Sequence, residues 1–183
     1  MSRAYYRDLV SEPLAISNST VTLTAATDVI IFPNTSQIAI QAADFRPGKV
    51  WKLTACGLIT TNASASTCVM NVRWGIALGS PSMGSSITNG VPAGQTNVPF
   101  LLQVYCICRT LGLTGGTNSS VTANASFIAA GTGTAGQAWT QSFGGTLVTF
   151  DAAGANVGGI QVSMNFSLAA SLGLHLVTLE ALN

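Results

Sequence analysis

Charged side chains are scarce in this sequence. Its 183 residues include seven Lys or Arg, six Asp or Glu and one His, so charged residues make up 7% of the chain, against about a quarter in an average soluble domain. The net charge of +1 provides no field to attract nucleic acid or acidic lipid. Disorder does not explain the composition, because disordered chains have few apolar residues and 48% of this chain is hydrophobic. We therefore expect no nucleic-acid partner, and a surface that largely faces other protein.

The sequence also lacks a long apolar run and an export signal. No uninterrupted stretch reaches the roughly 18 apolar residues of a transmembrane helix. The opening MSRAYYRDLVSEPLAIS has neither the apolar core nor the small-residue cleavage site of a secretory signal. We expect no membrane partner, and a protein made inside the cell with its four cysteines reduced.

Catalytic motifs are missing as well. The sequence has one histidine, His175, and no G-x-S-x-G motif that would supply a nucleophilic serine for a catalytic triad with it. Alternation places His175 on one strand face with Val177 and Leu179. A packed or solvated histidine is expected there rather than a general base. The stretch GLTGGTNSS has no G-K-[ST], so it is not a phosphate loop. The sequence predicts no enzyme, no catalytic residue and no cofactor.

The cysteines show no metal-binding pattern, since there is no C-x-x-C and only one histidine. Cys106 and Cys108 would lie on one face of one strand, about 6.5 Å apart, which is poor for a disulfide. They are expected to be buried as small hydrophobic side chains. A hairpin turning at residues 62–66 would bring Cys56 and Cys68 near one another, although free thiols are favoured in a reducing compartment.

What the sequence does have is apolar–polar alternation. In TCVMNVRWGIALG (residues 67–79) the residues Cys68, Met70, Val72, Trp74, Ile76 and Leu78 fall on one side. Arg73 falls on the other side. A period of two over a dozen residues is typical of a strand buried on one face, so Arg73 is expected to point outward from a sheet.

The same alternation predicts six further core faces. They are Val21, Leu23 and Ala25; Trp51, Leu53, Ala55, Gly57 and Ile59; Phe100, Leu102, Val104, Cys106 and Cys108; Val121, Ala123, Ala125 and Phe127; Ile160, Val162, Met164, Phe166 and Leu168; and Leu172, Leu174 and Leu176. The other side of residues 160–168 is wholly polar (Gln161, Ser163, Asn165 and Ser167), and is expected to be wet or lightly packed.

About eight strands separated by Gly- and Pro-rich turns indicate an all-β antiparallel sandwich in one domain, residues 18–183. Residues 1–17 differ, because they hold four of the thirteen charges, Arg3, Arg7, Asp8 and Glu12, together with Tyr5 and Tyr6, and show no period. This segment is either a frayed terminus or an extended arm that orders on a neighbour, since Tyr and Arg anchor interfaces.

Several segments together resemble a family. FRPGKVWKLTACGLITT (45–61), MNVRWGIALG (70–79), TNVPFLLQVYCICRTLG (96–112) and the terminal HLVTLEALN are similar to small jelly-roll virion proteins of tailed bacteriophages. The resemblance implies a jelly roll that assembles as a homotrimer, binds the major capsid protein and decorates the capsid as a cement protein. It implies a place in the virion, assembled in the host cytoplasm.

The capsid contacts expected on this basis are Arg3, Tyr5, Tyr6 and Arg7 in the arm, with Arg73 and Arg109 as further candidates. A surface with few charges agrees with this role, because a free protein needs more surface charge for solubility and a symmetric assembly hides such a surface.

Two other functions stay open. A tail- or fibre-associated structural protein has the same kind of fold, and fold does not decide function. A carbohydrate-binding module would need an exposed aromatic platform. Trp51 and Trp74 fall on core faces, which leaves Trp139, expected in a Gly- and Thr-rich loop.

Overall fold

The computed structural model describes residues 12–14, 19–32, 40, 45–75, 78–112, 119–131, 138–151 and 159–182. Within these residues the chain forms thirteen β-strands and no helix, arranged in two sheets. None of the described residues forms a helix long and apolar enough to span a membrane.

The larger sheet has eight strands in the order β1-β13-β4-β8-β9-β10, with β2 also paired to β13 and β11 to β9. Every strand pair in it is antiparallel. Its strands are β1 (Glu12–Leu14), β2 (Ser19–Leu23), β4 (Val50–Thr60), β8 (Val98–Thr110), β9 (Ser119–Ala129), β10 (Trp139–Gly144), β11 (Val148–Phe150) and β13 (Ala170–Ala181).

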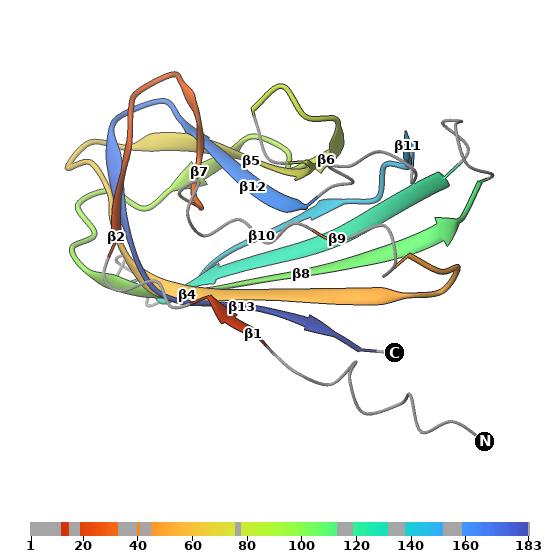
Figure 1. Ribbon diagram of the computed structural model, residues 1–183. Coiled ribbons are helices and arrows are strands. Elements are labelled where there is room, and N and C mark those ends of the chain that lie inside the picture. The colour runs from red at the N-terminus through yellow and green to blue at the C-terminus, as the bar shows by residue number, and fades with distance from the viewer. Residues whose placement is uncertain are drawn as a thin grey trace.

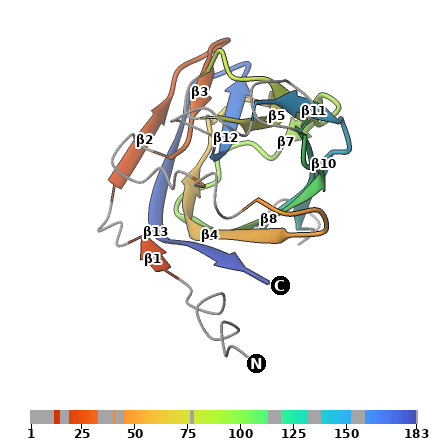
Figure 2. The same cartoon turned by 45° about the vertical axis from the view of Figure 1, so that its right-hand side comes forward.

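The smaller sheet has five strands in the order β3-β12-β5-β6, with β7 also paired to β5. It too is antiparallel, and it lies over the larger sheet as a second layer (Figures 1 and 2). Its strands are β3 (Asp28–Ile30), β5 (Ser66–Trp74), β6 (Ser82–Ser85), β7 (Asn89–Val91) and β12 (Ile160–Phe166). The predicted antiparallel sandwich is confirmed, and the finer jelly-roll connectivity stays a prediction.

Strict alternation explains the long strands. In β4 every second residue from Trp51 to Ile59 is buried, and in β8 the same holds from Val98 to Cys108. The two sheets bury one face of each against the other, which removes these side chains from water. Each Å² of apolar surface buried in this way stabilises the fold by about 25 cal/mol. The number of strands exceeds the expected eight because β1, β3, β6, β7 and β11 have only three or four residues each, too few to show a period.

Two aromatic clusters close the two ends of the core. At one end Phe45 lies 5.2 Å from Trp51, 5.5 Å from Trp74 and 5.1 Å from Phe150, between ring centroids. The other cluster comprises Phe100, Phe127, Trp139 and Phe166, with successive centroids 5.5, 4.9 and 6.0 Å apart. Tilted and stacked pairs at these separations add stability beyond the area that they bury.

A β-bulge in β13 overturns two expectations. The register against β4 shifts between Leu174 and Leu176, so the side chains after the bulge point to opposite faces from those that strict alternation gives. Leu176 is therefore 44% exposed rather than part of the core. His175 is exposed, whereas Val177 and Leu179 are buried, so the prediction that all three share a face is wrong.

The polar side of β12 is also different from the prediction. Gln161 and Ser163 are 1% and 0% exposed, so this side is not wet at these two positions, although Ser167 is exposed. Ser163 lies beside Arg73 of the adjacent strand and accepts a hydrogen bond from it. Neither amide atom of Gln161 has a hydrogen-bond partner.

The connection after β4 does not form the hairpin considered for residues 62–66. It passes from the larger to the smaller sheet, because β4 pairs with β8 and β13 while β5 pairs with β6, β7 and β12. Cys56 and Cys68 are both free and stand in different sheets. Two of the predicted core faces include one residue too many at their ends. The strand β2 ends at Leu23 and β5 ends at Trp74, so Ala25 and Leu78, which were expected in the core, are exposed.

Candidate interaction surface

The outer face of the larger sheet carries an apolar row that crosses four strands. In the strand registers Leu176 stands opposite Cys56, Cys56 opposite Leu101, and Leu101 opposite Ile128. Leu176 and Ile128 are each 44% exposed and Leu101 is 37% exposed, with Cys56 half-buried between them. We call these four residues the outer row.

The outer row exists because of the β13 bulge. Without the register shift between Leu174 and Leu176, alternation would turn Leu176 into the core and the row would end at β4. One residue row further along the strands, the outer face is polar, with Thr178, Thr54, Gln103 and Ser126 in register. An apolar centre beside an uncharged polar rim is typical of a surface that binds protein.

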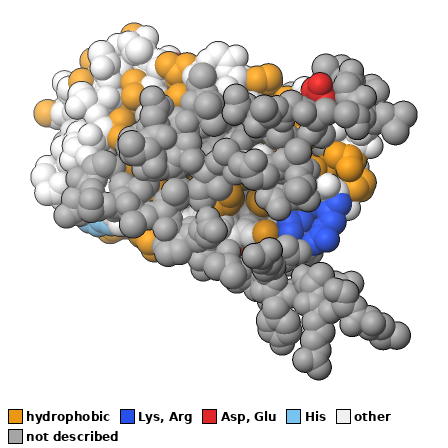
Figure 3. Space-filling model, in the orientation of Figure 1, with side chains coloured by type: hydrophobic (Ala, Val, Ile, Leu, Met, Phe, Trp, Pro, Cys, Tyr) orange, Lys and Arg blue, Asp and Glu red, His pale blue; other side chains and the backbone are white. Residues whose placement is uncertain are grey.

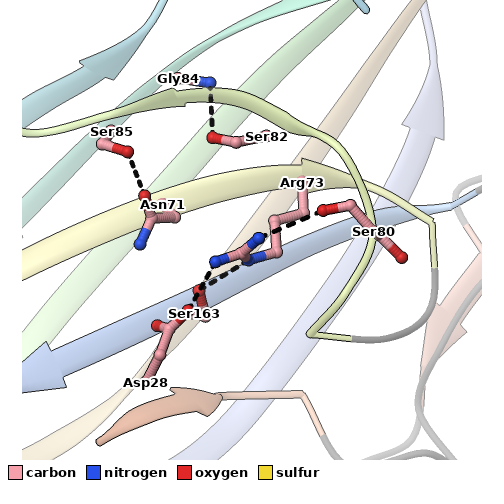
Figure 4. Close-up of polar contacts among 8 residues, drawn as sticks. All are labelled: Asp28, Asn71, Arg73, Ser80, Ser82, Gly84, Ser85 and Ser163. Carbon is pink, nitrogen blue, oxygen red and sulfur yellow. Dashed lines mark hydrogen bonds and ion pairs between the residues drawn. The ribbon is translucent and has the colours of Figure 1, made fainter.

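Arg73 does not reach toward solvent as a free charge. Its Nη2 lies 2.6 Å from Oδ2 of Asp28, its Nε donates to Oγ of Ser163 at 3.1 Å, and its Nη1 donates to the carbonyl of Ser80 at 3.1 Å. Figure 4 shows the side chain lying along the outer face of the smaller sheet between these partners. Arg73 therefore ties β3 and β12 to β5, and its charge is already paired within the chain.

We expect Arg73→Met to lower the free energy of unfolding by about 1–3 kcal/mol, because it leaves the partly buried Asp28 carboxylate without its cation. Asp28 already has one carboxylate oxygen, Oδ1, buried without a hydrogen-bond partner. The measurement is chemical denaturation of Arg73→Met, Asp28→Asn and the double variant. Arg109→Met is the control, since it makes the same change at an exposed arginine and should cost under about 0.5 kcal/mol. Additive losses in the double variant would contradict the pairing.

Of the other sequence-predicted contact residues, Arg109 lies exposed at the end of β8. Arg3, Tyr5, Tyr6 and Arg7 lie outside the described residues. The segment 1–17 that contains them is not wholly separate from the sandwich, because Glu12–Leu14 form β1 and pair with Val177–Leu179 at the edge of the larger sheet. The segment thus joins the fold through β13.

Cys106 and Cys108 are buried and free, as predicted, and Cys68 is buried and free as well. Burial raises the pKa of all three thiols, since the surroundings disfavour the thiolate. No three His, Cys, Asp or Glu side chains gather as metal ligands in the part of the chain that the structure describes. His175 stands exposed at the bulge.

Cys56 is the one cysteine outside the buried set, and it lies in the outer row. We expect a thiol reagent at mildly alkaline pH to modify one cysteine of the native protein quickly and the other three only on unfolding, because reactivity needs exposure and thiolate. The check is a timed colorimetric thiol titration, with Cys56→Ser as the control that should remove the fast phase. Fast modification of two or more thiols in the native protein would contradict the described burial.

The prediction that Trp139 could form an exposed aromatic platform for a carbohydrate is wrong. Trp139 begins β10 and is only 7% exposed, with its ring edge-on to Phe127 at a centroid distance of 4.9 Å. A sugar-binding tryptophan needs an open ring face, and this ring belongs to the core. Trp51 and Trp74, each 3% exposed, are in the core as predicted.

The sequence missed the outer row as a unit. Its members are residues 56, 101, 128 and 176. The first three look like single apolar residues on the wet side of a strand, and alternation placed Leu176 in the core. Only the strand registers join them. The chain order provided one indication that Leu101 and Ile128 lie on neighbouring strands. The segments that become β8 and β9 follow one another in the chain, separated by a turn, and consecutive strands usually pair.

No family model, no curated protein and no solved structure matches this chain. The interaction surface therefore rests on the geometry of the chain itself.

Proposed function

We propose that this protein is a structural virion protein of a tailed phage, a capsid decoration or cement protein that binds the outside of the shell as a homotrimer. The observation that carries the proposal is the outer row, an exposed apolar strip across Leu176, Cys56, Leu101 and Ile128 on a sheet face with few charges. Such a strip is better hidden against protein than left in water.

The proposed mechanism is thermodynamic. A decoration protein that binds the assembled shell, and not its dissociated subunits, adds its binding free energy to the stability of the shell. A rigid sandwich suits this role, because the strands that carry the outer row are ordered before binding and little conformational entropy is lost on docking.

A tail- or fibre-associated structural protein is the second candidate, and the same surface would serve it. The carbohydrate-binding alternative is not carried further, because burial of Trp139 removes the residue on which it depended.

The experiment is the copy number of this chain in purified particles from its source, measured by quantitative mass spectrometry against the most abundant shell protein. A ratio within a few-fold of the shell protein supports decoration. A handful of copies moves the chain to the tail or a vertex. Absence from particles refutes the virion proposal.

A further inference from the structure

The larger sheet ends at β10, and one edge of this strand has no neighbouring strand. Among the strands that the structure describes, β10 pairs only with β9. Gly145 N donates to the carbonyl of Ala123 at 2.7 Å, and hydrogen-bonded pairs recur at every second residue of an antiparallel ladder. Every second residue counted back from Gly145 therefore bonds to β9, whereas Thr140 and Ser142 turn their backbone N–H and C=O groups away from it.

The free stretch of the β10 edge is short. Within the described part of the chain, neither Thr140 nor Ser142 makes a backbone hydrogen bond outside the β9 pairing, and both residues are exposed. Beyond Ser142 the strand β6 approaches, since a Cβ on Gly84 would stand 2.5 Å from the backbone of Gly144. The edge is therefore open from Thr140 to Ser142 and closed by β6 at Gly144.

β10 carries none of the features that commonly keep a sheet edge from pairing, which include charged side chains, proline and bulges. By contrast, β1 contains Glu12 and Pro13, and β3 contains Asp28. The β10 sequence is WTQSFG, and its register against β9 runs without a shift. In the view of Figure 3 the visible Lys, Arg, Asp and Glu side chains lie toward one side of the molecule, away from the side on which Figure 1 labels β7. An uncharged edge with unpaired backbone groups is a template for an added strand.

Two shallow hollows flank the free edge. The outer hollow, of about 450 Å³, lies on the outer face of the larger sheet and is lined by residues that include Tyr105, Asn124, Ser126, Ser142 and Gly144. The inner hollow, of about 310 Å³, lies between β10 and β7 and is lined by Asn89, Gly90, Pro92, Ala138, Trp139 and Thr140. No charged residue lines either hollow. Side chains of an extended strand alternate between the two faces of a sheet, so successive residues of an added strand face the two hollows in turn.

The inner side of β10 holds polar groups that lack partners. Gln141 is 3% exposed, and neither atom of its amide is hydrogen-bonded. Trp139, which lines the inner hollow, is buried, and its Nε1 has no partner either. Buried polar groups are seldom left unpaired, because each one costs free energy. A hydroxyl or amide side chain that faced inward from an added strand would stand beside Gln141, since side chains opposite one another on paired strands are neighbours.

We propose that the free edge of β10 binds an extended, uncharged peptide segment of the shell protein, which adds a strand to the larger sheet. Main-chain hydrogen bonds to Thr140 and Ser142 supply affinity, and alternate side chains in the two hollows supply specificity. The segment carries Ser, Thr, Asn or Gln on the side that faces Gln141. The identity of the partner rests on the proposed function. The outer hollow adjoins the outer row, because Ser126 precedes Ile128 by two residues on the same face of β9, so one partner covers both.

A second copy of this chain fits the edge less well. Two residues offer free backbone groups, and β6 closes the edge at Gly144, so edge-to-edge pairing of two sandwiches gains few hydrogen bonds. Pairing of β10 with β10 of another copy also produces a twofold dimer, whereas the proposed assembly is a trimer.

The test uses the full chain and a displayed library of short random peptides, with binding of the enriched peptides measured by fluorescence anisotropy. We expect enriched peptides to carry few charges, and Ser142→Pro to weaken their binding about tenfold, because it removes an edge donor and leaves a peptide carbonyl unpaired. Proline is tolerated at an edge where the N–H faces outward, so pairing with β9 is retained, and the thermal midpoint verifies the fold. Ser142→Ala keeps the N–H and is the matched control, which should bind within about twofold of the wild type.

Hydrogen–deuterium exchange of the wild type tests the same edge without any variant. A bound peptide should slow exchange in residues 139–144, because edge amides gain partners, and should leave β2 unchanged. This measurement decides the matter even where Ser142→Pro does not fold.

Four results overturn the inference: no enriched peptide, equal binding to Ser142→Pro, unchanged exchange in β10, or dissociation of the trimer by Ser142→Pro, which would assign the edge to a second copy. The proposed function fails separately. Absence of the chain from particles refutes the function and leaves peptide binding at the edge standing. Wild-type occupancy of Ser142→Pro on particles refutes the shell protein as the occupant and leaves the function standing.

Discussion

Replacing Gly57 with alanine is expected to lower the free energy of unfolding by at least about 3 kcal/mol, at the upper end of what overpacking costs. Gly57 lies in the middle of β4, on the core side of the larger sheet. A Cβ at this position would collide with the backbone carbonyl of Gly173 in β13 and stand 3.0 Å from Cε1 of Phe100. Because the first obstacle is backbone, neither rotamer change nor a small side-chain movement relieves it.

The thermal midpoint of Gly57→Ala should fall by roughly 10 °C, at 2–4 °C per kcal/mol for a chain of this size. Gly90→Ala is the matched control. Gly90 is also a strand glycine, in β7, but a Cβ there meets nothing within 4 Å, so its midpoint should change by no more than about 2 °C. If the two variants melt together near the wild-type midpoint, the close approach of β4 and β13 is not as described.

Local alternation predicted the core well where strands are long and regular. The period of two holds along all of β4, in β8 from Val98 to Cys108 and in β9 from Val121 to Ala129, so one face of each was recognisable from the sequence. Alternation identified Gly57 as a core-side residue but not the reason for a glycine there, because that reason is a carbonyl 116 positions later in the chain, that of Gly173. The close approach of two backbones depends on the tertiary structure and leaves no pattern in the local sequence.

The predictions that failed are those in which one residue changes the register or a distant group changes the environment. The bulge inserts His175 as an extra residue between Leu174 and Leu176, and histidine at the bulged position itself gives no sequence signal of a break in alternation. Gln161 and Ser163 look solvent-facing because they are polar, yet Ser163 is covered by the Arg73 side chain that comes from another strand. Trp139 follows a Gly-rich stretch but starts a strand whose inner face it shares with Phe143.

The candidate surfaces were predicted only in part. Arg109 was singled out from the sequence, but nothing in the chain order places it beside the turn at residues 46–49; two backbone hydrogen bonds do that. Arg73 was correctly assigned to the outward side of β5, but its partner Asp28 lies 45 positions earlier, in a strand too short to recognise. A sequence pattern indicates which face a side chain occupies, and contact between strands decides what it meets there.

Removing the outer row is expected to reduce occupancy of the chain on particles at least tenfold. In Leu101→Thr with Ile128→Thr, two of the three exposed aliphatic side chains of the row are replaced by a residue that favours strands, so the fold is retained. Loss of buried apolar contact at an interface costs about 1–2 kcal/mol per such side chain, and 1.4 kcal/mol is a factor of ten in affinity. Occupancy is measured by co-sedimentation of added protein with purified particles.

Ile87→Thr is the matched control, because Ile87 is 77% exposed and stands outside the row, between the short strands β6 and β7. It should bind particles as the wild type does. Cys56 supplies an independent readout, since it lies within the row between Leu176 and Leu101: its fast thiol reaction should slow on particles when the wild-type chain is bound. Wild-type occupancy of the double threonine variant, together with an unprotected Cys56 on particles, would show that this face points to solvent in the assembly, and the apolar strip would then need a different partner.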